Sequence, residues 1–539
     1  MEFDFIFRDL KIVDGTGNPY YYGDIGIKGD VIEKIGRIKE AGRKEFNCKG
    51  MTASPGFIDI HSHGEYTIMQ EPTASCYISQ GVTSLVVGNC GGTLAPVNQL
   101  NYELYGDKLN KKLGVKEISF GDYLNYLDDI DKSINIIPLA AHGNIRSAIV
   151  GCKDIEISKN DIEEMKNLLR KAMDAGAFGF STGLIYNPGM FAEAEEIIAF
   201  AEVVKEYDGI YSTHMRNESH MVIEAMLEAI NVAKKTGVNL ELSHLKVSGK
   251  QKHGLCKIML GLIEYYRRLG FDISGDAYPS THCKTGLINC LPPWTRKNGM
   301  SYFKKIINDE KITEKITEEL KLPTTEWENM IWDAGLDDIR ISVTDNSEME
   351  KYNNMTLIEI AEELNIEPYK VIYYLLNKDV SIATIAGGVS QKDNTEIILN
   401  EAVCVSSDGN ISSKELGNTH PRSYMAFTKI LTDFVRDNKL MTIENAVRKM
   451  TSMPARKLGI KDRGLLLEGF KADISIFNDN SLKYNSTFKK PHATSRGMEY
   501  VLVNGEIVLK SEKPKNIYSG KLLRKNQNGE LSFKISFNH

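Results

Sequence analysis

Short apolar runs alternate with amphipathic stretches between residues 55 and 460. Runs with the length and β-branched content of buried strands lie at 57–61, 84–90, 136–142, 178–182, 209–214, 238–244, 271–276, 381–386 and 403–408. Helical patterns separate them, most clearly at 160–175, with Asn160 as N-cap, and at 192–207, 219–236 and 442–457. This alternation predicts an α/β fold with a parallel sheet. Because eight strands close such a barrel, we assign 381–386 elsewhere and predict a (β/α)8 TIM-like barrel.

Both ends of the chain show a different, two-residue alternation. Residues 2–13 place phenylalanines at alternate positions, and residues 24–28 and 31–35 flank a Gly-Asp turn. Residues 472–477 and 500–508 show the same alternation of apolar and polar residues, and Asn504-Gly505 predicts a hairpin. We therefore predict a small β-sandwich domain built from residues 1–54 and 461–539, with the barrel domain, 55–460, between them. Residues 294–350, rich in Lys and Glu, predict a helical insertion that covers the barrel mouth as a lid.

Several predicted strands end in residues that bind metals. The run at 55–63, Pro-Gly-Phe-Ile-Asp-Ile-His-Ser-His, ends in two histidines one residue apart, which share one face of a strand. The carboxyl ends of barrel strands meet at one mouth, where active sites lie. The nitrogen, sulfur and oxygen donors there are ligands that zinc accepts: His61, His63, Cys90, His214, His244 and Asp408.

The composition of the chain limits the kinds of partner that we expect it to bind. The 539 residues suffice for one large and one small domain, and the net charge is −6 without a basic stripe interleaved with aromatics, so we expect no nucleic-acid partner. The first five residues are acidic and no apolar run could span a bilayer, so we expect a cytoplasmic protein without a membrane partner. The eight scattered cysteines predict reduced thiols, most of them buried hydrophobes such as Cys76, Cys256 and Cys290. No pattern indicates an oligomeric state.

A set of motifs identifies a family. The run at 55–63 is followed by Gly-Val-Thr-Ser-Leu-Val-Val-Gly-Asn-Cys-Gly (81–91), Ser-Thr-Gly-Leu-Ile-Tyr (181–186), Thr-His-Met-Arg-Asn-Glu (213–218), Ser-His-Leu-Lys (243–246), Ser-Asp-Gly (407–409) and His-Pro-Arg (420–422). With these motifs in this order, the chain resembles the D-aminoacylases (N-acyl-D-amino-acid deacylases) of the amidohydrolase superfamily. The resemblance implies a tightly bound zinc on Cys90, His214 and His244. It also implies a weaker second metal position on His61, His63 and Asp408, with Cys90 able to bridge the two.

The resemblance also implies an activity: zinc-dependent removal of the N-acyl group from small-molecule N-acyl-D-amino acids. Zinc activates water and polarises an amide oxygen, and a carboxylate beside it moves the proton from the water to the departing amine. Asp408 is implied in that catalytic role. Around the substrate α-carboxylate the resemblance places Tyr186, Lys246, Tyr278 and Arg422, whose fork matches a carboxylate.

Two departures from the family pattern and several alternatives remain open. Gly64-Glu65 stands where the family commonly has an Asp pair, and residues 278–285 differ from its Tyr-Pro-Tyr and Ser-rich loop. Ser280, Thr281 and Thr285 are therefore all candidates for the remaining hydroxyl contact. His142 either hydrogen-bonds near the site or is a core histidine.

Other functions compete with the deacylase. A cyclic amidohydrolase of the hydantoinase or dihydroorotase type is disfavoured by the Cys90 ligand and by the lack of an evident carboxylated lysine at a strand end. A D-aminopeptidase is a further relative. An inactive scaffold is disfavoured by the six intact ligands.

Overall fold

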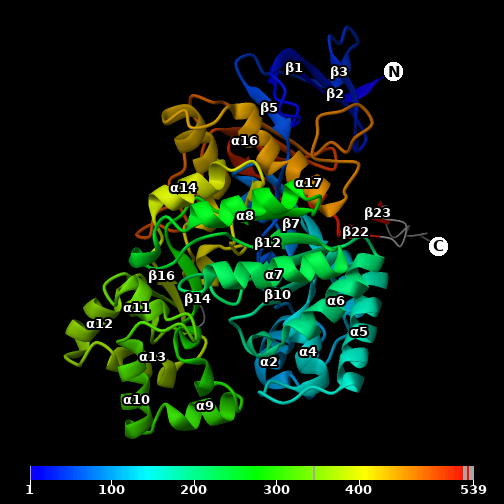
Figure 1. Ribbon diagram of the computed structural model, residues 1–539. Coiled ribbons are helices and arrows are strands. Elements are labelled where there is room, and N and C mark those ends of the chain that lie inside the picture. The colour runs from blue at the N-terminus through cyan, green and yellow to red at the C-terminus, as the bar shows by residue number, and fades with distance from the viewer. Residues whose placement is uncertain (1, 344–345, 526–530, 533–539) are drawn as a thin grey trace.

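The computed structural model describes residues 2–343, 346–525 and 531–532. Within these ranges, parallel strands form the centre of the molecule (Figure 1). They are β6 (Phe57–Asp59), β7 (Val82–Val87), β8 (Asn135–Pro138) continued as β9 (Ala140–Ala141), β10 (Gly179–Gly183), β11 (Ile210–His214), β12 (Asn239–Leu242), β13 (Ile273–Ala277) and β17 (Val403–Val405). Each predicted barrel strand is present.

These strands close into a ring. One sheet has the order β6-β7-β8 and the other β17-β13-β12-β11-β10-β9, and Leu139 alone separates β8 from β9. The first and last strands meet through a parallel bridge between Ser62 and Gly409. The amide of Asp408 donates to the His61 carbonyl at 2.8 Å, and that of His63 donates to the Gly409 carbonyl at 2.8 Å. The predicted barrel is confirmed, and its closing seam lies where predicted ligands stand.

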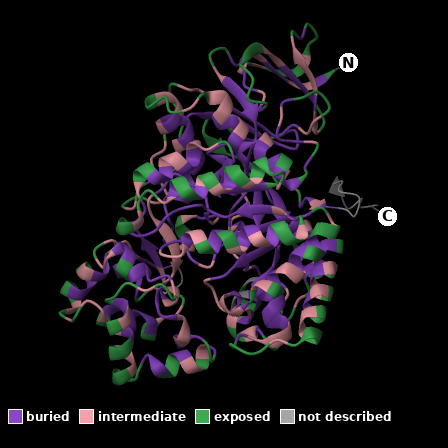
Figure 2. Cartoon of the chain, in the orientation of Figure 1, coloured by how far each residue is buried: buried purple, intermediate pink, exposed green. Residues whose placement is uncertain are grey.

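Helices cover the outside of the barrel (Figure 1). They are α1 (Ser75–Ile78), α2 (Tyr102–Leu113), α3 (Phe120–Asp129), α4 (His142–Val150), α5 (Lys159–Asp174), α6 (Ala194–Glu206), α7 (Val222–Thr236), α8 (Cys256–Arg268), α14 (Gln391–Leu399) and α15 (Arg422–Lys429). In α5 the buried side chains Met165, Leu169, Ala172 and Met173 recur at helical spacing. Figure 2 shows the same two-sidedness, with exposed residues on the outer faces of α5 to α8.

Two predicted helix details are wrong. The N-cap of α5 is Ser158 and not Asn160: the Ser158 hydroxyl accepts from the Asp161 amide in a capping box. The helix predicted over 442–457 is two helices, α16 (Ile443–Met450) and α17 (Ser452–Leu458). The break falls at Thr451 because Pro454 has no N–H and its ring would clash with the carbonyl four residues earlier.

The two ends of the chain share one nine-stranded sheet, at the top of Figure 1. It contains β1 (Phe3–Ile12), β2 (Tyr21–Lys28), β3 (Val31–Gly36), β4 (Gly42–Asn47), β5 (Thr52–Pro55), β18 (Ile474–Phe477), β19 (Met498–Val503), β20 (Glu506–Lys510) and β21 (Lys513–Pro514). The Phe7 ring stacks on Phe46 at 4.9 Å and meets the edge of Tyr500 at 5.3 Å, so both ends build one core. Asn504 and Gly505 have φ of 47° and 84°, as the predicted hairpin requires.

A separate layer lies between β13 and β17 in the chain. Strands β14 (Cys283–Gly286), β15 (Ile339–Ser342) and β16 (Ala383–Ala386) form a three-stranded antiparallel sheet, so the run at 381–386 is indeed not a barrel strand. Helices α9 (Met300–Ile306), α10 (Glu310–Leu320), α11 (Met330–Ala334), α12 (Leu357–Leu364) and α13 (Lys370–Lys378) pack with it around a core of their own, at the lower left of Figure 1. The described residues of the segment 294–350, which are 294–343 and 346–350, belong to this layer. Across the described residues, we find no helix with the length and apolarity to span a membrane.

Candidate metal centre

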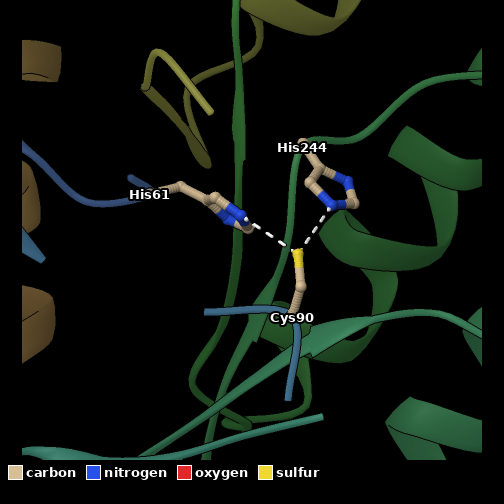
Figure 3. Close-up of side chains that lie close together, drawn as sticks. All are labelled: His61, Cys90 and His244. Atoms are coloured by element: carbon tan, nitrogen blue, oxygen red, sulfur yellow. Dashed lines mark hydrogen bonds between the residues drawn. The ribbon is translucent and has the colours of Figure 1, made fainter. Parts of the chain in front are cut away.

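Cys90 lies at the centre of the barrel mouth, among three histidines. Its Sγ is 3.3 Å from His61 Nε2, 3.7 Å from His214 Nδ1 and 3.4 Å from His244 Nε2. Figure 3 shows His61 and His244 turned toward the sulfur from different parts of the chain. The thiol and the ring nitrogens of His61 and His244 lie close enough together to hold one metal ion, and His214 Nδ1 adjoins the sulfur.

A second group of donors adjoins the first across the barrel seam. His63 Nε2 lies 3.2 Å from Asp408 Oδ1, and His61 Nε2 lies 3.7 Å from the same oxygen. The other oxygen, Asp408 Oδ2, pairs with Arg422 Nη1 at 2.8 Å. Both histidines follow the end of β6 rather than lying on it, so the seam and not strand pleating brings them together. The two groups share His61, and a third group of possible donors contains His214, Glu218 and His244. The assignment of these donors to the two predicted metal positions stays a prediction.

Buried carboxylates stand behind the histidines. Glu218 Oε1 is 3.0 Å from His244 Nδ1, Glu218 Oε2 is 3.6 Å from His214 Nε2, and Asp276 Oδ2 is 3.4 Å from His61 Nδ1. These separations are charge contacts rather than hydrogen bonds: Lys246 Nζ donates to His244 Nδ1 at 2.9 Å, and within the described residues the far nitrogens of His61 and His214 have no hydrogen-bond partner. The carboxylates therefore place negative charge behind the rings that could hold a metal. Glu218 also pairs with Lys246 Nζ at 2.8 Å.

The protonation states suit metal binding. Burial holds the pKa of His214 and His244 well below the ordinary value, which leaves both rings neutral at pH 7. Burial and Asp408 raise the pKa of the Cys90 thiol well above its usual range, and a metal ion is the group that would convert it to a thiolate. Burial alone would raise the pKa of Asp408, but Arg422 and the histidines outweigh it and keep this carboxyl ionised.

Three donor residues adopt left-handed backbone conformations. The φ angles of Cys90, His244 and Asp408 are 53°, 35° and 49°, a region that side-chain-bearing residues occupy at a cost of about 1–3 kcal/mol each. Strain of this kind persists only where the surrounding structure enforces it. Its occurrence at three residues of one cluster is typical of a functional site.

The four predicted substrate-binding residues surround the same mouth. The Tyr186 ring contacts His214 at 4.9 Å, and the Arg422 guanidinium lies 4.6 Å from the centre of the Tyr278 ring. Lys246 Nζ lies 5.9 Å from that ring centre. The Tyr278 hydroxyl is buried and has no hydrogen-bond partner within the described part of the chain. Both cations already face carboxylates, Lys246 with Glu218 and Arg422 with Asp408.

The structure resolves some open alternatives. Thr285 Oγ1 approaches the Tyr186 hydroxyl at 3.5 Å, whereas Ser280 and Thr281 contact His282. His142 is a core histidine: it is fully buried, and its Nε2 is 2.7 Å from Glu196 Oε1. All eight cysteines are free, and Cys76, Cys256 and Cys290 are buried as predicted.

Sequence reasoning missed the supporting carboxylates. Glu218 ends the motif at 213–218, four residues after His214, and Asp276 ends the strand predicted at 271–276. An acidic residue directly after a strand, or four residues after a ligand, was the available indication in each case. Glu328, from the layer between β13 and β17, accepts a hydrogen bond from the Glu218 amide at 2.7 Å. Nothing in the local pattern around Glu328 points to the site.

A barrel with sulfur, imidazole and carboxylate donors at its strand ends belongs to the class of barrel metalloenzymes. Residues 44–251 and 398–509 match the sequence profile described as the Amidohydrolase family, and the chain belongs to this family. The unmatched part, 252–397, contains the layer with β14 to β16.

Relatives within the family agree with the predicted resemblance to D-aminoacylases. The chain is 30% identical to N-acyl-D-glutamate deacylase of Alcaligenes xylosoxydans xylosoxydans over 97% of this chain and 96% of that protein. A crystal structure of D-aminoacylase superposes with a TM-score of 0.83 at 28% identity, over 97% of this chain and 100% of that one. N-acyl-D-glutamate deacylase of Bordetella bronchiseptica, solved with zinc and a phosphonate mimic of the tetrahedral intermediate, matches with the same values. The resemblance is confirmed.

Proposed function

We propose that this protein is a zinc-dependent hydrolase that removes the N-acyl group from N-acyl-D-amino acids. The observation that carries the proposal is the convergence of His61, His214 and His244 on Cys90 Sγ, within 3.7 Å or less. The names of the similar proteins, N-acyl-D-glutamate deacylase and D-aminoacylase, support the choice of substrate.

The donor set fits zinc. Cys90, His214 and His244 would hold the tightly bound ion, and His61, His63 and Asp408 would form the second, weaker position. Zinc in this mouth would activate a water molecule and polarise the amide oxygen of the substrate. The Nδ1 of His214 faces Cys90, and its buried Nε2 faces Glu218 at 3.6 Å without a hydrogen bond within the described part of the chain, so the carboxylate supplies negative charge behind this ligand.

Asp408 has the position and charge of the proton carrier. Arg422 holds its Oδ2, so Oδ1, which faces His63 Nε2 at 3.2 Å, is the oxygen that would take a proton from the attacking water and deliver it to the departing amine nitrogen. The same arginine keeps the carboxyl ionised before the reaction.

Tyrosine hydroxyls and paired cations would orient the substrate. The unpartnered Tyr278 hydroxyl and the Tyr186 hydroxyl are neutral donors, because burial raises the pKa of both tyrosines. They would bind the α-carboxylate together with Lys246 and Arg422. The preference for the D configuration rests on the relatives.

Paired N-acetyl-D- and N-acetyl-L-amino acids test this function. Amine release is measured with wild-type enzyme of known zinc content, with Cys90→Ala, and with Cys48→Ala, which removes a buried thiol far away in the terminal sheet. We expect release from D substrates only, loss of zinc and at least about a 100-fold loss of rate in Cys90→Ala, and no change in Cys48→Ala. Turnover that survives removal of zinc, or equal turnover of L substrates, would contradict the proposal.

A further inference from the structure

A pocket of about 430 Å³ extends from the second metal position toward β14. Its lining includes His63 and Asp408 of the second metal position together with Lys284, His420 and Arg422. Its size exceeds that of a carboxylate and a methyl group, so it has room for a substrate side chain or acyl group.

Lys284 is the cation in this pocket whose charge is not matched. Arg422 is paired with Asp408, and Lys246, deeper in the site, is paired with Glu218. Lys284 is half-buried on β14, and among the described residues its ammonium group has neither an ion pair nor a hydrogen-bond acceptor. Glu415 lines the same pocket but lies beyond ion-pair distance of it. Burial and the nearby Arg422 lower the pKa of Lys284 to about 8, so the group is still charged at pH 7.

A second donor in the pocket also lacks an acceptor. The His420 ring is 1% exposed, and its Nδ1 accepts from the Arg422 amide at 3.0 Å, which places the ring proton on Nε2. That Nε2 is buried and has no partner within the described ranges, and the same is true of Arg422 Nε. Unsatisfied buried donors beside an unmatched cation are the arrangement that an anionic oxygen donor group satisfies.

We propose that Lys284 and His420 form a subsite for a second carboxylate of the substrate, so that this enzyme prefers dianionic N-acyl-D-amino acids. The inference rests on the proposed deacylase function. The second carboxylate belongs to an aspartate or glutamate side chain, or to a dicarboxylic acyl group such as succinyl. The two sources present the same chemistry to Lys284, and the substrates chosen below distinguish them.

The test compares kcat/KM for N-acetyl-D-glutamate, N-acetyl-D-leucine, N-succinyl-D-leucine and N-acetyl-D-glutamine in four proteins. These are wild type, Lys284→Met, Lys284→Arg and Lys28→Met, which removes an exposed charge on β2. We expect wild type to favour a dianionic substrate. We expect Lys284→Met to lower kcat/KM for that substrate about 10- to 100-fold, the usual contribution of a charge-assisted contact, with little effect on the neutral side chains.

Each further outcome has one meaning. Partial recovery in Lys284→Arg and an unchanged Lys28→Met support the subsite, and the substrate that loses most identifies the source of the carboxylate. An equal loss for all substrates in Lys284→Met would overturn the inference, because Lys284 would then bind the α-carboxylate. A wild type that favours N-acetyl-D-leucine would overturn the inference and leave the deacylase function intact. A wild type that hydrolyses none of the four would contradict the deacylase function itself.

Discussion

Replacing Glu218 with glutamine tests the charge network behind the histidines. The carboxylate is 1% exposed, and it lies 2.8 Å from Lys246 Nζ and 3.0 Å from His244 Nδ1. Glu218→Gln keeps the shape but leaves the Lys246 ammonium, itself 4% exposed, without its counter-charge. Breaking a buried pair in this way costs about 3–5 kcal/mol of unfolding free energy, and the amide oxygen retains one hydrogen bond, so we expect a loss of about 2–4 kcal/mol.

The same change should weaken metal binding. Glutamine removes the negative charge behind His244 and His214, and loss of such a supporting carboxylate typically lowers metal affinity about 10- to 100-fold. Urea unfolding of metal-free protein measures the first effect, and zinc competition with a chromophoric chelator measures the second.

A control and a double variant complete the test. Glu228 pairs with Arg216 at 2.8 Å but is partly exposed, so Glu228→Gln should cost less than about 1 kcal/mol. Adding Lys246→Met to Glu218→Gln removes the stranded charge and should restore at least half of the lost stability. A Glu218→Gln protein with unchanged stability and unchanged zinc affinity would refute the assigned role of this carboxylate.

Two further changes test other parts of the structure. Because burial lowers the pKa of Lys284 from 10.5 to about 8, the unfolded chain binds more protons between these values, and wild-type stability should rise with pH across that window. The titratable and charged groups around Lys284 are Arg422, Glu415 and the histidines His420 and His492, which burial keeps neutral at pH 7. The full shift corresponds to about 3.4 kcal/mol, which partial access to water reduces, so Lys284→Met should stabilise the protein by about 1 kcal/mol at pH 7. Denaturant unfolding at pH 7 and 9.5 measures it, and a constant difference between the two proteins would contradict the assignment. Gly505→Ala should destabilise the protein by about 3 kcal/mol, because φ is 84° and the new Cβ would lie 2.1 Å from the Gly29 carbonyl oxygen. The control Gly50→Ala, at φ 82° in open space, should cost about 1 kcal/mol. Equal losses of stability in the two variants would exclude the clash.

The barrel was predictable because its strands are continuous β-branched runs separated by helices with clear stop residues. The ligands were predictable because each lies at the carboxyl end of a barrel strand or within four residues of it. Helix caps and breaks were harder to predict from the sequence. The run at 442–457 keeps its apolar period through Pro454, and the period alone does not locate the break at Thr451.

The supporting residues could not be derived from the chain pattern because their partners are distant in sequence. Glu328 reaches the amide of Glu218 from 110 residues away, and Lys284 becomes distinctive only because no described residue forms an ion pair with it. Such relations depend on three-dimensional placement. The domain boundaries at 54 and 460 remain predictions, as do the roles of the individual site residues.

The seam between β6 and β17 has a consequence for how the fold responds to metal. His61 and His63 lie on one margin and Asp408 on the other, and backbone hydrogen bonds already join them there. An ion held by all three would connect the first and last strands of the ring across more than 340 residues of intervening sequence. Metal occupancy and local opening of the ring are then one linked equilibrium, so the exchange rates of the His63 and Asp408 amide protons would report zinc concentration directly.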